Sequence, residues 1–426
     1  MLQKEISLFK TKNEFFLFLS ASIFVLLYSL LIEFHNYKQL TQFDSNVINA
    51  TVVKQYLKSK KSSAGKIKTY QVLKFKAATG FTFYSTASKN LIDLKGKQVT
   101  LEIFFKDINF FSYMSSFFAY HKIISINKES TFKQKLNTYL DNSHSNTTIS
   151  NIYKALYTAT PLNIELQTIF STLGVSHLLA ISGFHLGVLS GVLFFLLKYP
   201  YKFLQNRYFP YRNATRDLFI TVALLLLSYL LFLDSPPSLL RAFFMLIIGF
   251  ILYDRGFKIL SMQTLLLTVI ILLAFFPRLF LALGLWLSVA GVFYIFLFLI
   301  HFKHLSKVWQ FILIPFWVYL LMLPFSLIIF KSFTVYHPLS IVWTSLFTLF
   351  YPLSIFFHIT GFATVFDGII LNLLHLSQES IQISLNYKWL ILYIGLSFMA
   401  ILKKSFMWIT LSFSFLLLLY SLYKTT

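Results

Sequence analysis

The chain has 426 residues, of which 57% are hydrophobic and only 12% are charged, about half the charged fraction of a soluble domain. Long apolar runs fill its C-terminal half, which excludes a soluble globular enzyme and predicts an integral membrane protein with a small water-exposed part. The net charge of +22 favours polyanions such as nucleic acid or anionic lipid, although cytoplasmic loops also collect cations. The absence of cysteine excludes disulfides and thiolate chemistry.

Residues 1–36 form a predicted membrane anchor. An apolar run over Phe15–Ile32 follows several lysines, and cations before a span indicate a cytoplasmic N-terminus. Glu33 follows the run, where signal cleavage would need small residues. We therefore expect an uncleaved helix that places the next segment outside the cytoplasm.

Residues 42–127 indicate a small extracytoplasmic β domain. Segments such as Val72–Lys76 and Val99–Ile103 alternate in polarity, are rich in β-branched and aromatic residues, and are separated by polar turns. Five such strands in about 80 residues are typical of a small OB-like β-barrel, although SH3-like barrels look similar at this level. The domain holds 13 Lys and 4 acidic residues. We predict strands over 49–57, 70–77, 81–86, 98–105 and 122–126.

Residues 128–172 are predicted to form amphipathic interfacial helices, because Ile149, Ile152, Tyr153 and Leu156 share one helical face. Residues 173–426 are predicted to be a membrane domain. Together with the anchor they indicate a polytopic α-helical membrane protein with about 8 to 10 membrane helices, some broken or re-entrant. Predicted spans cover 175–197, 218–233, 239–253, 259–276, 279–300 and 308–330.

The charges of the connections predict the orientation of the spans. The loop over 198–216 carries five cations and no acid, and the turns at 254–258 and 301–307 are also basic. The alternate connections are poorer in cations, so positive-inside alternation places the basic set in the cytoplasm. If 339–358, which contains Pro352, is a re-entrant hairpin, then Lys403 and Lys404 also fall inside.

The most informative stretch is Gly174–Gly187. Glycines recur every four residues from Gly183, a spacing that lets helix backbones approach closely in lipid. His177, Ser182 and His185 are polar groups that either bond a neighbouring helix or face an aqueous path. A Ser182 nucleophile with a His185 base is disfavoured, because side chains three apart on one helix seldom reach attack geometry and would need a third orienting group.

Three further segments carry chemistry or breaks. Pro236 and Pro237 begin a helix in which Arg241 lies one turn into the membrane at its outer face. An arginine inside the membrane is usually paired with another group or functional, or else it extends its charged end to the membrane interface. The guanidinium is suited to binding phosphate through its fork of N–H donors. Pro277–Ser288 has small residues four apart, and His337–Ser340 marks another break.

The chain lacks the G-x-x-x-x-G-K-[ST] pattern and the H-x-H-x-D and H-E-x-x-H metal patterns. We therefore expect no metal, no cofactor and no enzymatic activity.

These motifs resemble those of the ComEC family of competence proteins, the inner-membrane DNA channels of natural transformation. Ser176–Gly187 is similar to the family signature, Pro237–Met245 to its second motif, and Pro338–Ser340 with Pro352–Leu353 to its late membrane motif. The resemblance covers about 155–353, and the anchor with its β domain looks like the family's OB-like N-terminal module. It implies passage of single-stranded DNA from periplasm to cytoplasm.

The sequence departs from the family pattern in three places. Ala282 and Trp286 flank Gly284 where the family has Asp and Gln. The acidic residue that usually follows the lead-in helix of the family is replaced near Ala159–Thr160. A C-terminal metallo-β-lactamase-like domain, which many members have, does not follow the last span. Degradation of the second strand is therefore expected to fall to another protein.

A Lys-rich outer domain can concentrate a polyphosphate strand, and aromatic rings grip its bases. A wet path must then carry each phosphate across hydrocarbon. The path candidates are His177, Ser182, Gly183, His185, Gly187, Ser238 and Arg241. The candidate DNA-binding lysines are Lys54, Lys58, Lys60, Lys61, Lys66, Lys68, Lys74 and Lys76. The candidate stacking residues, half of which should be core, are Tyr56, Tyr70, Phe81, Phe83 and Tyr84.

The expected location is the bacterial inner membrane. The expected partners are single-stranded DNA, membrane lipid, a periplasmic DNA-binding competence protein, a separate nuclease and a cytoplasmic ATPase or helicase. Two alternatives stay open: a transporter or flippase for another anionic or lipid-linked substrate, and an anchored assembly protein whose basic β domain docks other competence factors.

Overall fold

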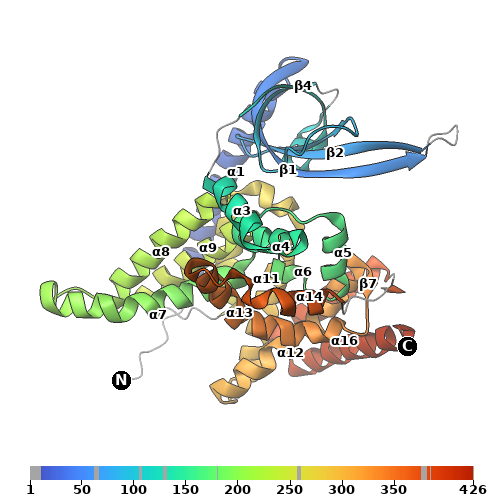
Figure 1. Ribbon diagram of the computed structural model, residues 1–426. Coiled ribbons are helices and arrows are strands. Elements are labelled where there is room, and N and C mark those ends of the chain that lie inside the picture. Colours follow the sequence, from blue (N-terminus) through green and yellow to red (C-terminus); the bar gives the residue numbers. More distant parts are fainter. Residues whose placement is uncertain are drawn as a thin grey trace. The chain divides into compact units, whose positions relative to one another are not determined.

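The computed structural model describes residues 11–61, 67–104, 108–127, 132–179, 181–256, 261–375, 381–383 and 385–425. The chain divides into two compact units (Figure 1). The β unit comprises 13–164 and 271–282, and the bundle unit comprises the remaining residues. The finer four-part division expected from the sequence stays a prediction.

The predicted anchor is helix α1 (Lys12–Leu40), which continues past the apolar run. Its 29 residues span about 44 Å, more than the roughly 30 Å of a bilayer core. The C-terminal part of α1 is fixed inside the β unit. Arg278, in the 3-10 helix η1 (Pro277–Leu281), makes two hydrogen bonds of 2.7 and 2.6 Å to the Glu33 carboxylate. Tyr37 Oη donates to the Ile108 carbonyl at 2.7 Å.

The five predicted strands are confirmed, and a short one joins them to make a six-stranded sheet in the order β5-β3-β2-β1-β4-β6. Two residues cannot show an alternating pattern, which is why β5 escaped prediction. The β1–β2 pair forms a long ribbon (Figure 1). The bounds are β1 (Ser45–Lys61), β2 (Ile67–Ala77), β3 (Thr82–Ala87), β4 (Gln98–Phe104), α2 (Phe110–Ser115), β5 (Phe117–Phe118) and β6 (Tyr120–Ile126).

The two ends of this strand order come together. Only Ala119 separates β5, which pairs in parallel with β3, from β6, which pairs antiparallel with β4. Ser85 Oγ on β3 lies 2.6 Å from His121 Nδ1 on β6. The inner face holds a core that includes Phe75, Phe83 and other residues with no exposed area. A closed OB-like barrel stays a prediction.

Three helices follow the sheet: α3 (Phe132–Ser143), α4 (Thr147–Thr158) and α5 (Ile164–Thr172). The apolar face predicted to meet a membrane interface is covered by protein, because Ile149, Ile152, Tyr153 and Leu156 are each at most 2% exposed. This face therefore supplies core packing. An interfacial location of α3 and α4 stays a prediction.

The bundle unit is helical, and seven of the described helices in the whole chain are long and apolar enough to cross a membrane. The span predicted over 175–197 is shifted toward the C-terminus: the helix long and apolar enough to cross a membrane is α7, and the short α6 precedes it. The predicted loop over 198–216 is wrong, since α7 continues through most of it. The bounds are α6 (Ser176–Leu179), α7 (Gly183–Tyr208), α8 (Ala214–Phe232), α9 (Pro237–Asp254), α10 (Met262–Phe275), α11 (Leu283–His301), α12 (Lys307–Phe330), α15 (Tyr387–Leu402) and α16 (Lys404–Thr425).

The predicted hairpin over 339–358 is one continuous helix, α13 (Ser340–Thr360), which accommodates Pro352 in its interior. The chain nevertheless returns after it. Strand β8 (Ile381–Gln382) pairs with β7 (Ser332–Phe333), so both ends of the intervening segment lie side by side. That segment includes α14 (Asp367–His375).

We predict that Arg278→Gln lowers the free energy of unfolding by about 1.5–3 kcal/mol, because the Glu33 carboxylate would stay half-buried without its charged donor. Both side chains of this ion pair are 18% exposed. Thermal unfolding of the purified protein measures the change. Arg216→Gln is the control, since its ion pair with Asp254 is 55% and 30% exposed and should contribute about 1 kcal/mol or less. Equal shifts for the two variants would contradict the prediction.

Candidate functional site

A backbone break between α6 and α7 organises the predicted signature. Ser182 lies in extended conformation as the N-cap of α7, and its backbone N–H and hydroxyl both lie 3.3 Å from His185 Nδ1. Sequence analysis placed both residues on one helix, but Ser182 lies just before α7 and His185 lies in its first turn. The two residues cap the start of α7 reciprocally. Ser238 Oγ on α9 donates to the Ile181 carbonyl at 2.7 Å. Ala180 lies outside the described residues.

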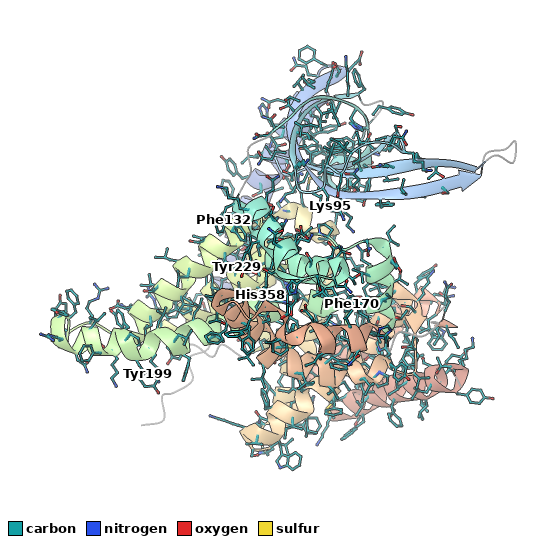
Figure 2. All side chains as sticks on the ribbon, viewed as in Figure 1. Lys95, Phe132, Phe170, Tyr199, Tyr229 and His358 are labelled. Carbon is teal, nitrogen blue, oxygen red and sulfur yellow. The ribbon has the colours of Figure 1, made fainter. Side chains whose placement is uncertain are left out.

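The His185 ring joins α7 to α13. It has no exposed area and meets Phe347 and Tyr351 edge to face, with both centroid distances at 4.9 Å. The hydroxyl of Tyr351 lies 3.1 Å from that of Tyr229 on α8, which Figure 2 labels. Over the part of the chain that the structure describes, His185 Nε2 makes no hydrogen bond. The signature thus packs on the late motif through an aromatic cage.

The segment before α6 contacts the other end of the late motif. Gly174 has φ +70°, and a Cβ added there would lie 3.0 Å from the His337 imidazole. His337 Nδ1 lies 3.1 Å from the Tyr319 hydroxyl of α12, and its ring stacks on Phe333. His177 Nε2 lies 3.1 Å from Thr344 Oγ1 on α13. Glycine is needed at 174 both for its conformation and for this close approach.

Arg241 joins α9 to α11. Its side chain is 2% exposed, and Nη1 donates to the Gly284 carbonyl at 2.7 Å. Its Nε has no partner among the residues described, and no carboxylate there forms an ion pair with it. A desolvated cation without a counter-ion is costly. An anion close to this guanidinium would therefore be strongly attracted to it.

The close helix approach predicted for the glycines holds at one of them. A Cβ on Gly183 would lie 3.1 Å from the Ala242 Cβ of α9, but nothing lies within 4 Å of such an atom on Gly187 or Gly191. We call the contacts among the Gly174–Gly187, Pro237–Met245, Gly284–Ser288 and His337–Leu353 segments the motif junction. All four segments belong to the bundle unit.

The path candidates differ in exposure. His177 and Gly187 are exposed, Ser182, Gly183 and Ser238 are half-buried, and His185 and Arg241 are buried. Sequence reasoning missed Tyr319, Thr344 and Tyr351. Thr344 and Tyr351 lie seven residues apart on α13, a one-face spacing that could have indicated them.

The candidate lysines of the β unit lie on β1 and β2, with Lys66 outside the described residues. Lys54 and Lys58 are exposed, and Lys74 and Lys76 are half-buried. Lys60, Lys61 and Lys68 lie within the strands.

Two of the five candidate stacking residues belong to the core, as expected for about half of them. Phe81 and Phe83 are 3% and 0% exposed, because they point into the sheet's core. Tyr56, Tyr70 and Tyr84 are half-buried.

A family described as Competence protein matches residues 160–425, more than half of the chain, and the matched region includes the whole motif junction. No curated protein and no solved structure matches the chain.

We predict that Gly174→Ala destabilises the bundle by about 1 kcal/mol or more, because alanine is strained at positive φ and its Cβ would press on His337. Gly187→Ala is the matched control: it lies inside a helix with open space around it, and should be neutral or stabilising by up to about 1 kcal/mol. Unfolding midpoints in detergent compare the two. A Gly174→Ala midpoint at or above that of Gly187→Ala would refute the prediction.

Proposed function

Because the chain belongs to the competence protein family, we propose that it passes single-stranded transforming DNA across the bacterial inner membrane. The family membership itself supports a role in DNA uptake for competence. The observation that supports the finer proposal best is the motif junction, where segments up to about 180 residues apart meet and Arg241 is buried without a carboxylate partner among the described residues.

The proposed orientation places the N-terminus in the cytoplasm and the β unit in the periplasm. Cations before α1 and in the connections near 207–216, 255 and 303–307 support it. The β7–β8 pairing supports it further, since a chain that returns to the same side before α15 brings Lys403 and Lys404 to the basic side. The meeting of β3, β4, β5 and β6 supports closure into an OB-like barrel.

In the proposed path, Arg241 receives phosphates in passing. A guanidinium presents a fork of donors that matches phosphate oxygens, and in a low-dielectric site this attraction is strong. Because His185 and Arg241 are buried, a strand can reach them only when α7 separates from α9 and α13. We therefore propose that the motif junction is a gate that opens during uptake.

The protein in this proposal binds and conducts DNA without enzymatic activity. The periplasmic DNA-binding protein, the nuclease and the cytoplasmic motor stay proposed partners. A transporter or flippase for another anion would use the same buried cation. The two functions separate in a deletion strain, which would still bring labelled DNA into the cytoplasm if the substrate were another anion.

We predict that Arg241→Ala and His185→Ala each reduce transformation at least 100-fold while the protein level stays normal, since each removes a buried polar group from the path (about 2.7 kcal/mol or more). Arg255→Ala is the matched control, because Arg255 is exposed at the C-cap of the same helix. Transformant counts and membrane immunoblots give the measurement. Normal transformation in the Arg241 and His185 variants would exclude them from the path.

We further predict that a disulfide between Gly183→Cys and Ala242→Cys blocks uptake. The chain has no cysteine of its own, and the two Cβ positions lie 3.1 Å apart, near the roughly 3.5–4.5 Å of a disulfide. Oxidation should stop DNA entry and reduction should restore it, whereas each single cysteine variant should respond to neither. Full uptake by the oxidised, cross-linked protein would mean that α7 and α9 need not separate.

A further inference from the structure

An aromatic row crosses the outer face of the β unit. Cross-strand pairing places Lys74 beside Tyr84 and Tyr84 beside Phe118, and on the other side of Ala119 it places Tyr120 beside Phe104. The Phe118 and Tyr120 rings meet edge to face at 5.2 Å. Lys54 continues the row beyond Lys74. The row consists of Lys54, Lys74, Tyr84, Phe118, Tyr120 and Phe104.

These rings point outward because of strand alternation. Their sequence neighbours Phe83, Ile103 and Phe117 are at most 6% exposed and fill the core. By contrast Phe104 is 39%, Phe118 49% and Tyr120 66% exposed. Single exposed aromatics are ordinary, but a contiguous row of them on neighbouring strands marks a binding surface.

The lysine end of the row attracts anions. Lys54 lies directly opposite Lys74, and like charges in that position destabilise a sheet. The Lys74 Nζ lies 5.1 Å from the centre of the Tyr84 ring. The pKa of Lys95, which Figure 2 labels, is lowered, chiefly by burial and partly by the positive charges of Lys154 and Lys54. The nearby carboxylate of Asp93 opposes this shift. An anionic ligand would relieve this repulsion.

We propose that the aromatic row binds unpaired bases of a single strand, while Lys54 and Lys74 neutralise its phosphates. This inference rests on the proposed function and assigns its outer binding surface to residues that sequence analysis did not identify: Phe104, Phe118 and Tyr120. Every base has a π-face, so stacking tolerates any sequence but requires the base to be unpaired. In a duplex those faces are already stacked, so the row selects single strands.

The experiment uses the full-length protein in detergent and fluorescence anisotropy with labelled oligonucleotides of about 12 nucleotides. One oligonucleotide carries thymine bases, and the other is abasic with the same number of phosphates. We expect the abasic strand to bind at least 10-fold more weakly. Tyr120→Ala and Phe118→Ala should each weaken thymine-strand binding by about 5-fold or more and leave abasic binding unchanged. Lys54→Gln with Lys74→Gln should weaken both and flatten the salt dependence.

Phe111→Ala is the matched control. Phe111 is 66% exposed, the same fraction as Tyr120, but it lies on helix α2 and belongs to none of the strands that form the row. If Tyr120→Ala binds the thymine strand as tightly as Phe111→Ala does, the row does not stack bases. Such a result leaves the proposed channel function standing, because that function is judged by DNA entry in the Arg241 variants.

A second measurement distinguishes a lipid surface as the occupant. A fluorophore on Lys122→Cys, next to Tyr120 and on exposed β6, reports what covers the row in protein reconstituted into nanodiscs. Quenching by added thymine strand supports the proposal. Quenching by spin-labelled lipid, with no response to the oligonucleotide, would overturn it in favour of membrane contact.

Discussion

The bundle unit depends on a single constraint: hydrocarbon cannot hydrogen-bond a broken backbone, so protein groups must do so. The chain breaks between α6 and α7, and the polar groups that satisfy the break come from the signature and from α9. Ser182 and His185 cap the new helix, and Ser238 holds the Ile181 carbonyl. Because Arg241 lies one turn after Ser238, satisfying the break also fixes the guanidinium beside Gly284.

The same contacts explain why polar residues are tolerated in so apolar a bundle. His185 lies against the aromatic rings of Phe347 and Tyr351, and Arg241 bonds a backbone carbonyl and no carboxylate among the residues that the structure describes. An aspartate paired with Arg241 would satisfy it permanently and would repel a phosphate. A carbonyl is a weaker partner that carries no charge, so the guanidinium keeps its affinity for a passing anion. Incomplete satisfaction is therefore suited to transient binding.

Sequence patterns predicted most of the helices and strands and identified the motif segments, but they did not predict how these segments contact one another. Alternation in Val99–Ile103 identified β4, yet β5 has two residues and is defined only by its partner β3. Apolar runs located the spans, whereas the break before Gly183 depends on Ser238, more than 50 residues away. Glycine spacing could not distinguish Gly183, where an added Cβ would meet Ala242 of α9, from Gly187, where an added Cβ would meet nothing within 4 Å. In each case the missing information is a long-range partner.

The two proposed surfaces divide the chemistry of a nucleotide between them. Bases are hydrophobic faces with no net charge, and the outer aromatic row suits them because water drives stacking there. The attraction between a phosphate and a cation is weak in water and strong in a low-dielectric site. The buried guanidinium of Arg241 is therefore suited to binding phosphates. Neither surface reads the edge of a base, where sequence information resides. Under these two proposals the protein would hold any single strand outside the membrane by its bases and conduct it inside by its backbone, which is what uptake of DNA of arbitrary sequence requires.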